Sequence, residues 1–330
     1  MRWSTKSLAC VGKAGVTAGL FVLLFRPETF WLSPELWGED ISLRSLVDEL
    51  RDVETHHLVF WLVFATWVKL CGMFSGMFRW RLLLRAQGLS IPFLYLVQSW
   101  FVGRFFGIFL PGTIGLDGYR VYDSARYTGE VIRPTTVIVV EKLIGFTALT
   151  LLVFLTLPMG YRLLGSNTPL VAVCMMAAGG LALLAFLLLL NPRVIRVLTS
   201  VIPTPLRVRR QLAKLGAAIA AYHHKRPTLL AATGLGLLVH LATCLMYFGT
   251  MSALRTQNAT IADIFFVAPL MIWATVLGPS VGGEGIREAV FVVVLGSKIG
   301  SVQAFLISHL GWWVGELVPF LIGAPIFLLR

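Results

Sequence analysis

Ionisable side chains interrupt the long apolar stretches of this sequence at positions where a solvated loop is not expected. They are Lys69, Arg104, Asp117, Arg120, Glu141, Lys142, Glu284, Arg287, Glu288 and Glu316. A charge at the centre of a bilayer costs about 2.5–3.5 kcal/mol on insertion scales, so each such residue is a functional candidate. The chemistry open to them is ion pairing, anion binding and proton transfer.

Two glycine-rich loops carry the same order of an acid and an arginine. Gly115–Arg120 reads G-L-D-G-Y-R and Gly282–Arg287 reads G-G-E-G-I-R, 167 residues apart. A glycine turn that leads into a helix offers free backbone N–H groups to an anion, and arginine adds a planar fork that binds phosphate. The residues expected to contact an anionic group are Arg104, Pro111, Gly112, Gly115, Asp117, Arg120, Gly282, Gly283, Glu284 and Arg287.

The acids of these loops have two interpretations. Asp117 and Glu284 pair with Arg120 and Arg287 when the site is empty, or carry protons. Alternatively, each acid–arginine pair neutralises itself and ties its hairpin to the neighbouring helices. The remaining charges, candidates for coupling to an ion, are Lys69, Glu141, Lys142, Glu288 and Glu316. Among them, Lys142 is a local partner for Glu141 or points elsewhere, and Lys69 also fits a lysine that snorkels toward the surface.

The composition excludes a soluble protein. Hydrophobic residues make up 57% of the 330 residues, charged residues only 13%, and the mean hydropathy is +0.81. The net charge of +12 lies in short segments between apolar runs, which is typical of a membrane protein facing anionic lipid and not of a nucleic-acid binder. No metal-ligand spacing and no P-loop occur, and the G-P-S-V-G match at Gly278–Gly282 lacks the strand a nucleophile elbow needs. We expect no catalytic residue, metal or cofactor.

The apolar runs predict an all-α polytopic membrane protein. About six stretches are full transmembrane helices, namely 11–25 (a marginal one), 56–78, 131–157, 168–190, 228–252 and 302–329. The segments 91–130 and 263–298 are broken by glycine and proline. They are predicted to form two re-entrant or broken helical hairpins with tips at 111–115 and 278–283.

Lysine and arginine in the short connections set the orientation. The segments 79–90 and 191–227 are basic, whereas 26–55 is acidic. The positive-inside rule therefore places both basic segments, the N-terminus and the C-terminus in the cytoplasm.

The two loop motifs belong to a wider internal repeat. The amphipathic segment 41–53 maps onto 208–220 at the same offset, and each half reads helix, amphipathic segment, helix, hairpin, helix. Three crossings per half invert one half relative to the other, which is typical of secondary transporters. We predict the halves to be 1–160 and 161–330; a chance match of small residues is the alternative.

The motifs resemble the lysylphosphatidylglycerol synthase transmembrane, or flippase-like, family. The residues that carry the resemblance are Arg79–Leu84, Ser99–Gly107, Phe109–Gly112 with Gly115, Asp117 and Arg120, Glu141-Lys142 and Pro279–Glu288. The resemblance covers nearly the whole chain. The chain departs from the synthase members in having Leu116 before the acid, where a glycine is frequent, and we expect it to do without their soluble aminoacyl-transferase domain.

This resemblance implies an integral protein of a bacterial or archaeal plasma membrane that moves an anionic phospholipid or a lipid-linked glycan between leaflets. The loop residues named above then become its head-group site. Three alternatives stay open: a membrane-embedded lipid or glycolipid transferase, its non-catalytic partner, and a secondary transporter of a soluble anion. The expected partners are membrane lipids, with a lipid-modifying enzyme as a further candidate and no nucleic acid.

Overall fold

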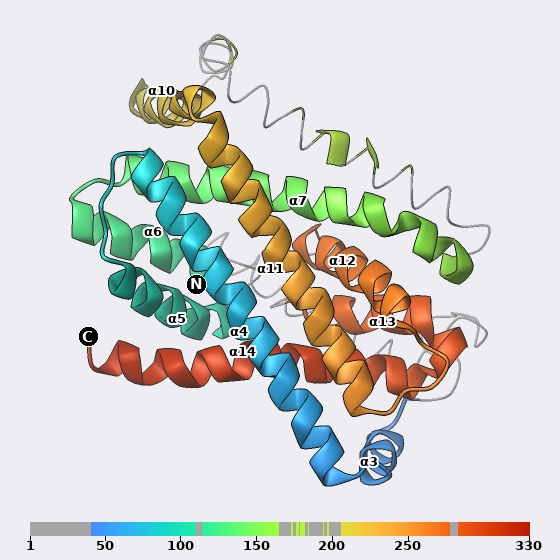
Figure 1. The fold of residues 1–330 in the computed structure, drawn as a ribbon. Coiled ribbons are helices and arrows are strands. Elements are labelled where there is room, and N and C mark those ends of the chain that lie inside the picture. The colour runs from blue at the N-terminus through green and yellow to red at the C-terminus, as the bar shows by residue number, and fades with distance from the viewer. Residues whose placement is uncertain are drawn as a thin grey trace, which may run out of the picture.

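The computed structural model describes residues 41–109, 114–164, 206–277 and 283–330, with scattered residues between 165 and 205. Helices account for nearly all of these residues, and no strand occurs among them (Figure 1). The elements are α3 (Leu43–Arg51), α4 (Thr55–Ala86), α5 (Phe93–Phe109), α6 (Ile114–Thr128), α7 (Ile132–Leu164), α10 (Leu206–Ala220), η3 (Ala221–His224), α11 (Arg226–Ala253), α12 (Ile261–Leu277), α13 (Ile286–Ile299) and α14 (Ser301–Leu328).

Four helices of the described chain are long and apolar enough to cross a bilayer: α4, α7, α11 and α14. They confirm four of the predicted spans and the all-α polytopic class. The predicted spans at 11–25 and, for the most part, 168–190 lie outside the described residues.

One predicted boundary is wrong. The prediction ended the helix at residue 78 and assigned 79–90 to a basic connection, but α4 continues to Ala86 and buries Arg79. The apolar run stops at residue 78, whereas the helix stops where Gly88 adopts a positive φ of 77°. An arginine with a partner inside the bundle does not end a helix, and hydropathy alone does not reveal that partner.

The two predicted hairpins correspond to the helix pairs α5–α6 and α12–α13, whose members contact each other. Glycine lets the first pair approach closely, since a Cβ atom on Gly115 would lie 2.6 Å from the carbonyl oxygen of Phe106. The second pair leads directly into α14 through Gly300, whose φ of 87° suits glycine and permits the sharp change of direction. The tip residues 110–113 and 278–282 lie outside the described residues.

The described helices occur in two series of the same order, α3 to α7 and α10 to α14. Their packing is exchanged between the series: α5 contacts α14 while α12 contacts α7, and α3 contacts α14 while α10 contacts α7. The equivalent helices α4 and α11 lie side by side, running in opposite directions, at the centre of the bundle (Figure 1). Small residues bring these two together, with Gly72 against Ala242 and Gly249 against Ala65. The inversion of one half relative to the other stays a prediction.

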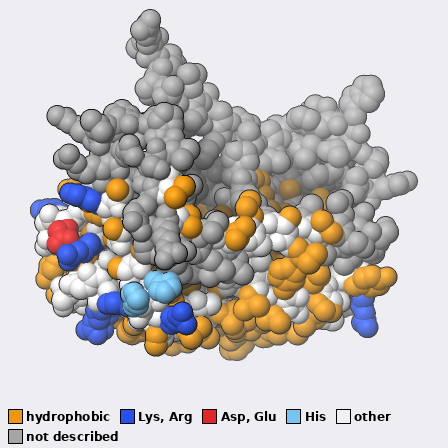
Figure 2. Space-filling model, turned by 90° about the horizontal axis from the view of Figure 1, so that it is seen from above, with side chains coloured by type: hydrophobic (Ala, Val, Ile, Leu, Met, Phe, Trp, Pro, Cys, Tyr) orange, Lys and Arg blue, Asp and Glu red, His pale blue; other side chains and the backbone are white. Residues whose placement is uncertain are grey.

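Polar contacts join the helix ends into two groups. At what we call the α10 end, Tyr222 donates to the carbonyl oxygen of Leu83 at 2.9 Å, and Gln87 donates to that of Ala218 at 2.8 Å. Burial raises the pKa of Tyr222. Seen from above, the described part of this end gathers basic and histidine side chains beside a broad apolar surface (Figure 2).

At the opposite end, which we call the α3 end, Arg255 pairs with Glu54 at 2.8 Å, and Gln303 donates to Glu49 at 2.6 Å. Each end therefore ties together segments from both series of helices.

Candidate functional site

A buried charge cluster joins α4, α6 and α7 around Glu141. Its Oε1 accepts a hydrogen bond from Nη2 of Arg79 at 2.8 Å, and its Oε2 accepts one from Nη2 of Arg120. The side chains of Arg79, Arg120 and Glu141 are 10%, 2% and 4% exposed. Both carboxylate oxygens receive a guanidinium donor, so the buried charge of Glu141 is paired and hydrogen-bonded.

Asp117 and Lys142 extend this cluster toward the first hairpin. Nη1 of Arg120 lies 3.4 Å from Oδ1 of Asp117, as the loop motif predicted. Oδ2 of the same carboxylate lies 2.6 Å from Nζ of Lys142. Lys142 therefore points to Asp117 and not to its sequence neighbour Glu141, which was one of the two placements that the sequence left open.

Two tryptophans enclose the Arg120 guanidinium. Its Cζ lies 4.2 Å from the ring centre of Trp80 on α4 and 4.4 Å from that of Trp100 on α5. Cation–π contacts of this kind stabilise a desolvated guanidinium. Arg120 thus holds α6 against α4, α5 and α7, with its guanidinium enclosed by protein, and its contact with an anionic group stays a prediction.

A second ion pair is more accessible. Nη1 of Arg104 on α5 lies 2.6 Å from Oε1 of Glu316 on α14, and the two side chains are 22% and 21% exposed. Lys69 on α4 reaches the same helix, because a Cβ atom on Gly315 would lie 3.4 Å from its Cε. The Lys69 ammonium also donates to the hydroxyl of Thr243 on α11 at 3.4 Å, so Lys69 lies between neighbouring helices.

A third cluster lies where the second hairpin meets α14. Glu288 is fully buried; its Oε2 accepts the backbone N–H of Gly285 at 2.8 Å, and its Oε1 lies 3.5 Å from Nδ1 of His309. Nε2 of His309 accepts the indole N–H of Trp313 at 2.8 Å, so this nitrogen carries no proton and the ring hydrogen faces Glu288. These contacts fix the start of α13 to α14.

Arg287 lies beside this third cluster. Its Nη1 is 4.0 Å from Glu288, and its Cζ is 5.6 Å from the ring centre of Trp312. Gly283, with a φ of 79°, passes close to it: a Cβ atom there would lie 3.1 Å from Nη2 of Arg287. Glu284 follows in the turn before α13 and is partly buried. Arg287 thus has an ion pair with its neighbour Glu288, and its pairing with Glu284 stays a prediction.

The structure brings most of the predicted charges into these three clusters and leaves part of the predicted loop undescribed. Gly115 is buried at the close approach of α5 and α6. Pro111, Gly112 and Gly282 lie outside the described residues. Their predicted contact with an anion therefore stays a prediction.

Sequence reasoning missed two members of the clusters. Arg79 was assigned to a loop, and His309 was considered isolated. A signal for His309 was present, because it stands 167 residues after Lys142 and so occupies the equivalent position of the repeat. Lys142 and His309 each lie next to an acid of their own half, Asp117 or Glu288.

Apolar helices of spanning length that enclose paired charges define this chain as a polytopic membrane protein with a polar interior. The chain belongs to the family described as Lysylphosphatidylglycerol synthase TM region, whose family model matches residues 11–323. Comparison with curated proteins gives no match.

Proposed function

We propose that this chain is a lipid flippase that moves an anionic phospholipid or a lipid-linked glycan between the two leaflets. Family membership supports a role connected with membrane lipids. The observation that carries the proposal is the partly exposed Arg104–Glu316 pair, held between α5 and α14, with Lys69 beside the neighbouring Gly315. These three side chains bring an excess of positive charge to the interior of the bundle.

The mechanism follows from competition for the Arg104 guanidinium. A phosphodiester offers two acceptor oxygens to an arginine, as the carboxylate of Glu316 does, so a passing head group replaces the carboxylate at Nη1. The phosphate thereby exchanges water for a fixed donor and avoids the cost of an unpaired charge in hydrocarbon. The acyl chains stay in the bilayer throughout, and the protein contributes binding without forming a covalent bond.

The buried clusters position this site. The Glu141 cluster fixes the first hairpin, which carries Arg104 at the end of α5, and the Glu288 cluster fixes the second hairpin against α14, which carries Glu316. We propose that the α10 end faces the cytoplasm of a bacterial or archaeal plasma membrane, because its basic residues match the cytoplasmic surface.

The test measures lipid movement in proteoliposomes. The purified chain is reconstituted with head-group-labelled phosphatidylglycerol, aminoacylated phosphatidylglycerol or a polyprenyl-phosphate sugar, and a membrane-impermeant quencher reports leaflet exposure. We expect fast exchange of one of these lipids, lost in Arg104→Ala and retained in Arg133→Ala. Arg133 is the matched control because its ion pair with Glu130 is exposed at the α10 end. Equal rates in both variants would overturn the proposed site.

Arg104 is a better test position than Arg120. Replacing Arg120 would leave Glu141 and Asp117 short of a buried partner and would empty the space between two tryptophans. Loss of activity in that variant would then report folding. Arg104 is partly exposed, so its replacement tests binding more directly.

A further inference from the structure

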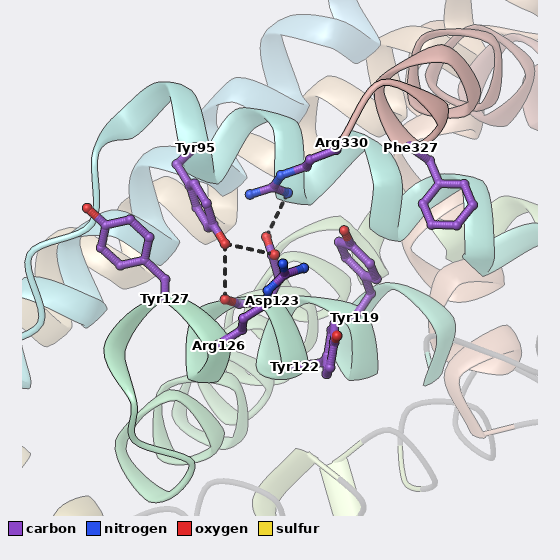
Figure 3. A pocket seen from close by; sticks show the side chains of 8 residues that line it. All are labelled: Tyr95, Tyr119, Tyr122, Asp123, Arg126, Tyr127, Phe327 and Arg330. Atoms are coloured by element: carbon purple, nitrogen blue, oxygen red, sulfur yellow. Dashed lines mark hydrogen bonds and ion pairs between the residues drawn. The ribbon is translucent and has the colours of Figure 1, made fainter.

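A pocket of about 400 Å³ lies between α5, α6 and the end of α14, apart from the three charge clusters (Figure 3). Most of its lining consists of aromatic rings and guanidinium groups. The residues that matter here are Tyr95, Tyr119, Tyr122, Tyr127, Arg126 and Arg330. Its volume falls in the range of small-molecule sites, about 300–1,000 Å³.

One wall of the pocket is a fixed polar network. The Tyr95 hydroxyl donates to Oδ1 of Asp123 at 2.8 Å, and Nη1 of Arg330 lies 2.9 Å from Oδ2 of the same carboxylate. The Arg330 guanidinium also stacks over the Tyr95 ring, with its Cζ 4.0 Å from the ring centre. Asp123 is buried and neutralised by this contact, so it does not repel an anion from the pocket.

Helix α6, which carries Asp123, also brings a second cation to the pocket. Arg126 lies on α6, one turn after Tyr122, and its side chain is exposed. No ion pair or hydrogen bond of Arg126 occurs with the described residues. The side chains that line the pocket include two guanidinium groups and one carboxylate and so sum to one positive charge, which suits the single negative charge of a phosphodiester.

The pocket lies at the ends of the spanning helices α4 and α14, where a leaflet surface is expected. Its α5 wall follows the connection from α4, and its α14 wall is the last turn of that helix, so it belongs to the α10 end (Figure 1). Tyrosines with an apolar ring and a polar hydroxyl are typical of this depth. Exposed tyrosine hydroxyls next to a phosphate site suit a ligand that carries its own hydroxyl groups.

We propose that this pocket binds the phosphate and adjoining polyol or sugar of a lipid head group at the membrane surface. Arg126 and Arg330 bind the phosphate oxygens, and Tyr119, Tyr122 and Tyr127 contact the hydroxyl-bearing part. The site is separate from Arg104 and does not depend on transport activity. A lipid head group and a soluble phosphate ester share this chemistry, and the experiment distinguishes them.

The test counts phosphatidylglycerol bound to the full chain by native mass spectrometry, with phosphatidylcholine as the zwitterionic comparison. In Arg126→Gln we expect the affinity for phosphatidylglycerol to fall by about tenfold or more, since a charge-assisted contact is lost. In Arg133→Gln, an exposed arginine of the same end outside the pocket, the affinity stays within about twofold of the unchanged chain. Tyr122→Ala, which keeps both cations, weakens binding to an intermediate degree.

The competing outcomes are distinct. Equal affinity in Arg126→Gln and Arg133→Gln overturns the pocket as a phosphate site. Displacement of the lipid by inorganic phosphate or glycerol phosphate at equal concentration overturns the lipid head group as its ligand. The proteoliposome rate reports separately on the flippase proposal: Arg126-dependent binding without exchange of any lipid supports the pocket and refutes the flippase.

Discussion

Nη1 of Arg104 lies 2.6 Å from Oε1 of Glu316, although the two residues are 212 positions apart and belong to different series of helices. The pair joins the first hairpin to the last helix of the chain. Its partial exposure places it among charges that a ligand can reach, in contrast to the pairs around Glu141, which protein atoms enclose.

Replacing Glu316 with glutamine tests this relationship from the acidic side. The neutral amide of that variant cannot hold the guanidinium as an ion pair, so Arg104 and Lys69 are left with a stronger attraction for an anion. We expect Glu316→Gln to bind phosphatidylglycerol several-fold more tightly, by roughly 1 kcal/mol, measured in nanodiscs of increasing lipid content. Glu130→Gln, which removes an exposed acid at the α10 end, is the control and should not change affinity. Weaker or unchanged binding in Glu316→Gln would argue against competition between the carboxylate and a phosphate.

Glu141 is expected to contribute strongly to the stability of the folded chain. In Glu141→Gln, Arg79 and Arg120 lose the carboxylate that neutralises them in a buried site, which costs about 3–5 kcal/mol when one partner of a buried pair is removed. The midpoint of thermal unfolding in detergent should fall markedly. Glu130→Gln serves as control because exposed pairs contribute about 0–1 kcal/mol. Similar unfolding midpoints for the two variants would show that the cluster does not hold the hairpin.

Two glycines of α11 make a matched pair for testing the position of Arg79. A Cβ atom on Gly236 would lie 2.8 Å from Nη1 of Arg79, so Gly236→Ala displaces a guanidinium that Glu141 holds. A Cβ atom on Gly234 has no neighbour within 4 Å. Alanine in a helix is otherwise favoured over glycine by about 0.5–1 kcal/mol. We therefore expect Gly234→Ala to raise or preserve the unfolding midpoint and Gly236→Ala to lower it; a rise in both would refute the close contact.

The elements of this fold could be predicted because each depends on local properties of the sequence. Twenty or so apolar residues form a spanning helix wherever they occur, and glycine with proline interrupts such a run. The same reason made it possible to predict the helix pairs α5–α6 and α12–α13 and the surface helices α3 and α10. The ends of the helices were harder to predict. Helix α4 continues past its apolar run because Arg79 has a partner in α7, which the sequence does not reveal.

The partners of the charges could not be predicted, because they depend on how the helices pack. The Asp117–Arg120 pair was predicted from the repeated loop motif, and the segment forms a helix in which residues three positions apart share one face. The contacts of Glu141 with Arg79 and Arg120 cross between helices, and no spacing in the sequence encodes them. The pocket beside Tyr95 likewise joins α5, α6 and α14, and its tyrosines follow no motif.

Asp263 closes the base of the second hairpin at the α3 end. Its Oδ2 lies 2.7 Å from Nζ of Lys298 at the end of α13, and accepts the N–H and hydroxyl of Thr260 at 2.7 and 2.9 Å. Burial alone would raise the pKa of this carboxyl, but the hydrogen bonds from Lys298 and Thr260 outweigh it and hold the pKa below its usual 3.8.

A lowered pKa fixes the direction of a pH effect on stability. The folded chain binds the Asp263 proton less readily than the unfolded chain, so the stabilisation is present above pH 3.8 and is lost as the pH falls through the folded pKa. In Asp263→Asn we expect a loss of about 1–3 kcal/mol near neutral pH, as for a buried hydrogen bond to a charged group. The difference from the unchanged chain should shrink in strong acid, whereas Asp52→Asn, at an exposed position of the same end, should show no such difference. Thermal unfolding followed from neutral to acidic pH, together with amide exchange in α13, measures this difference in stability. A difference that stays constant with pH would show that the carboxylate charge does not hold α12 to α13.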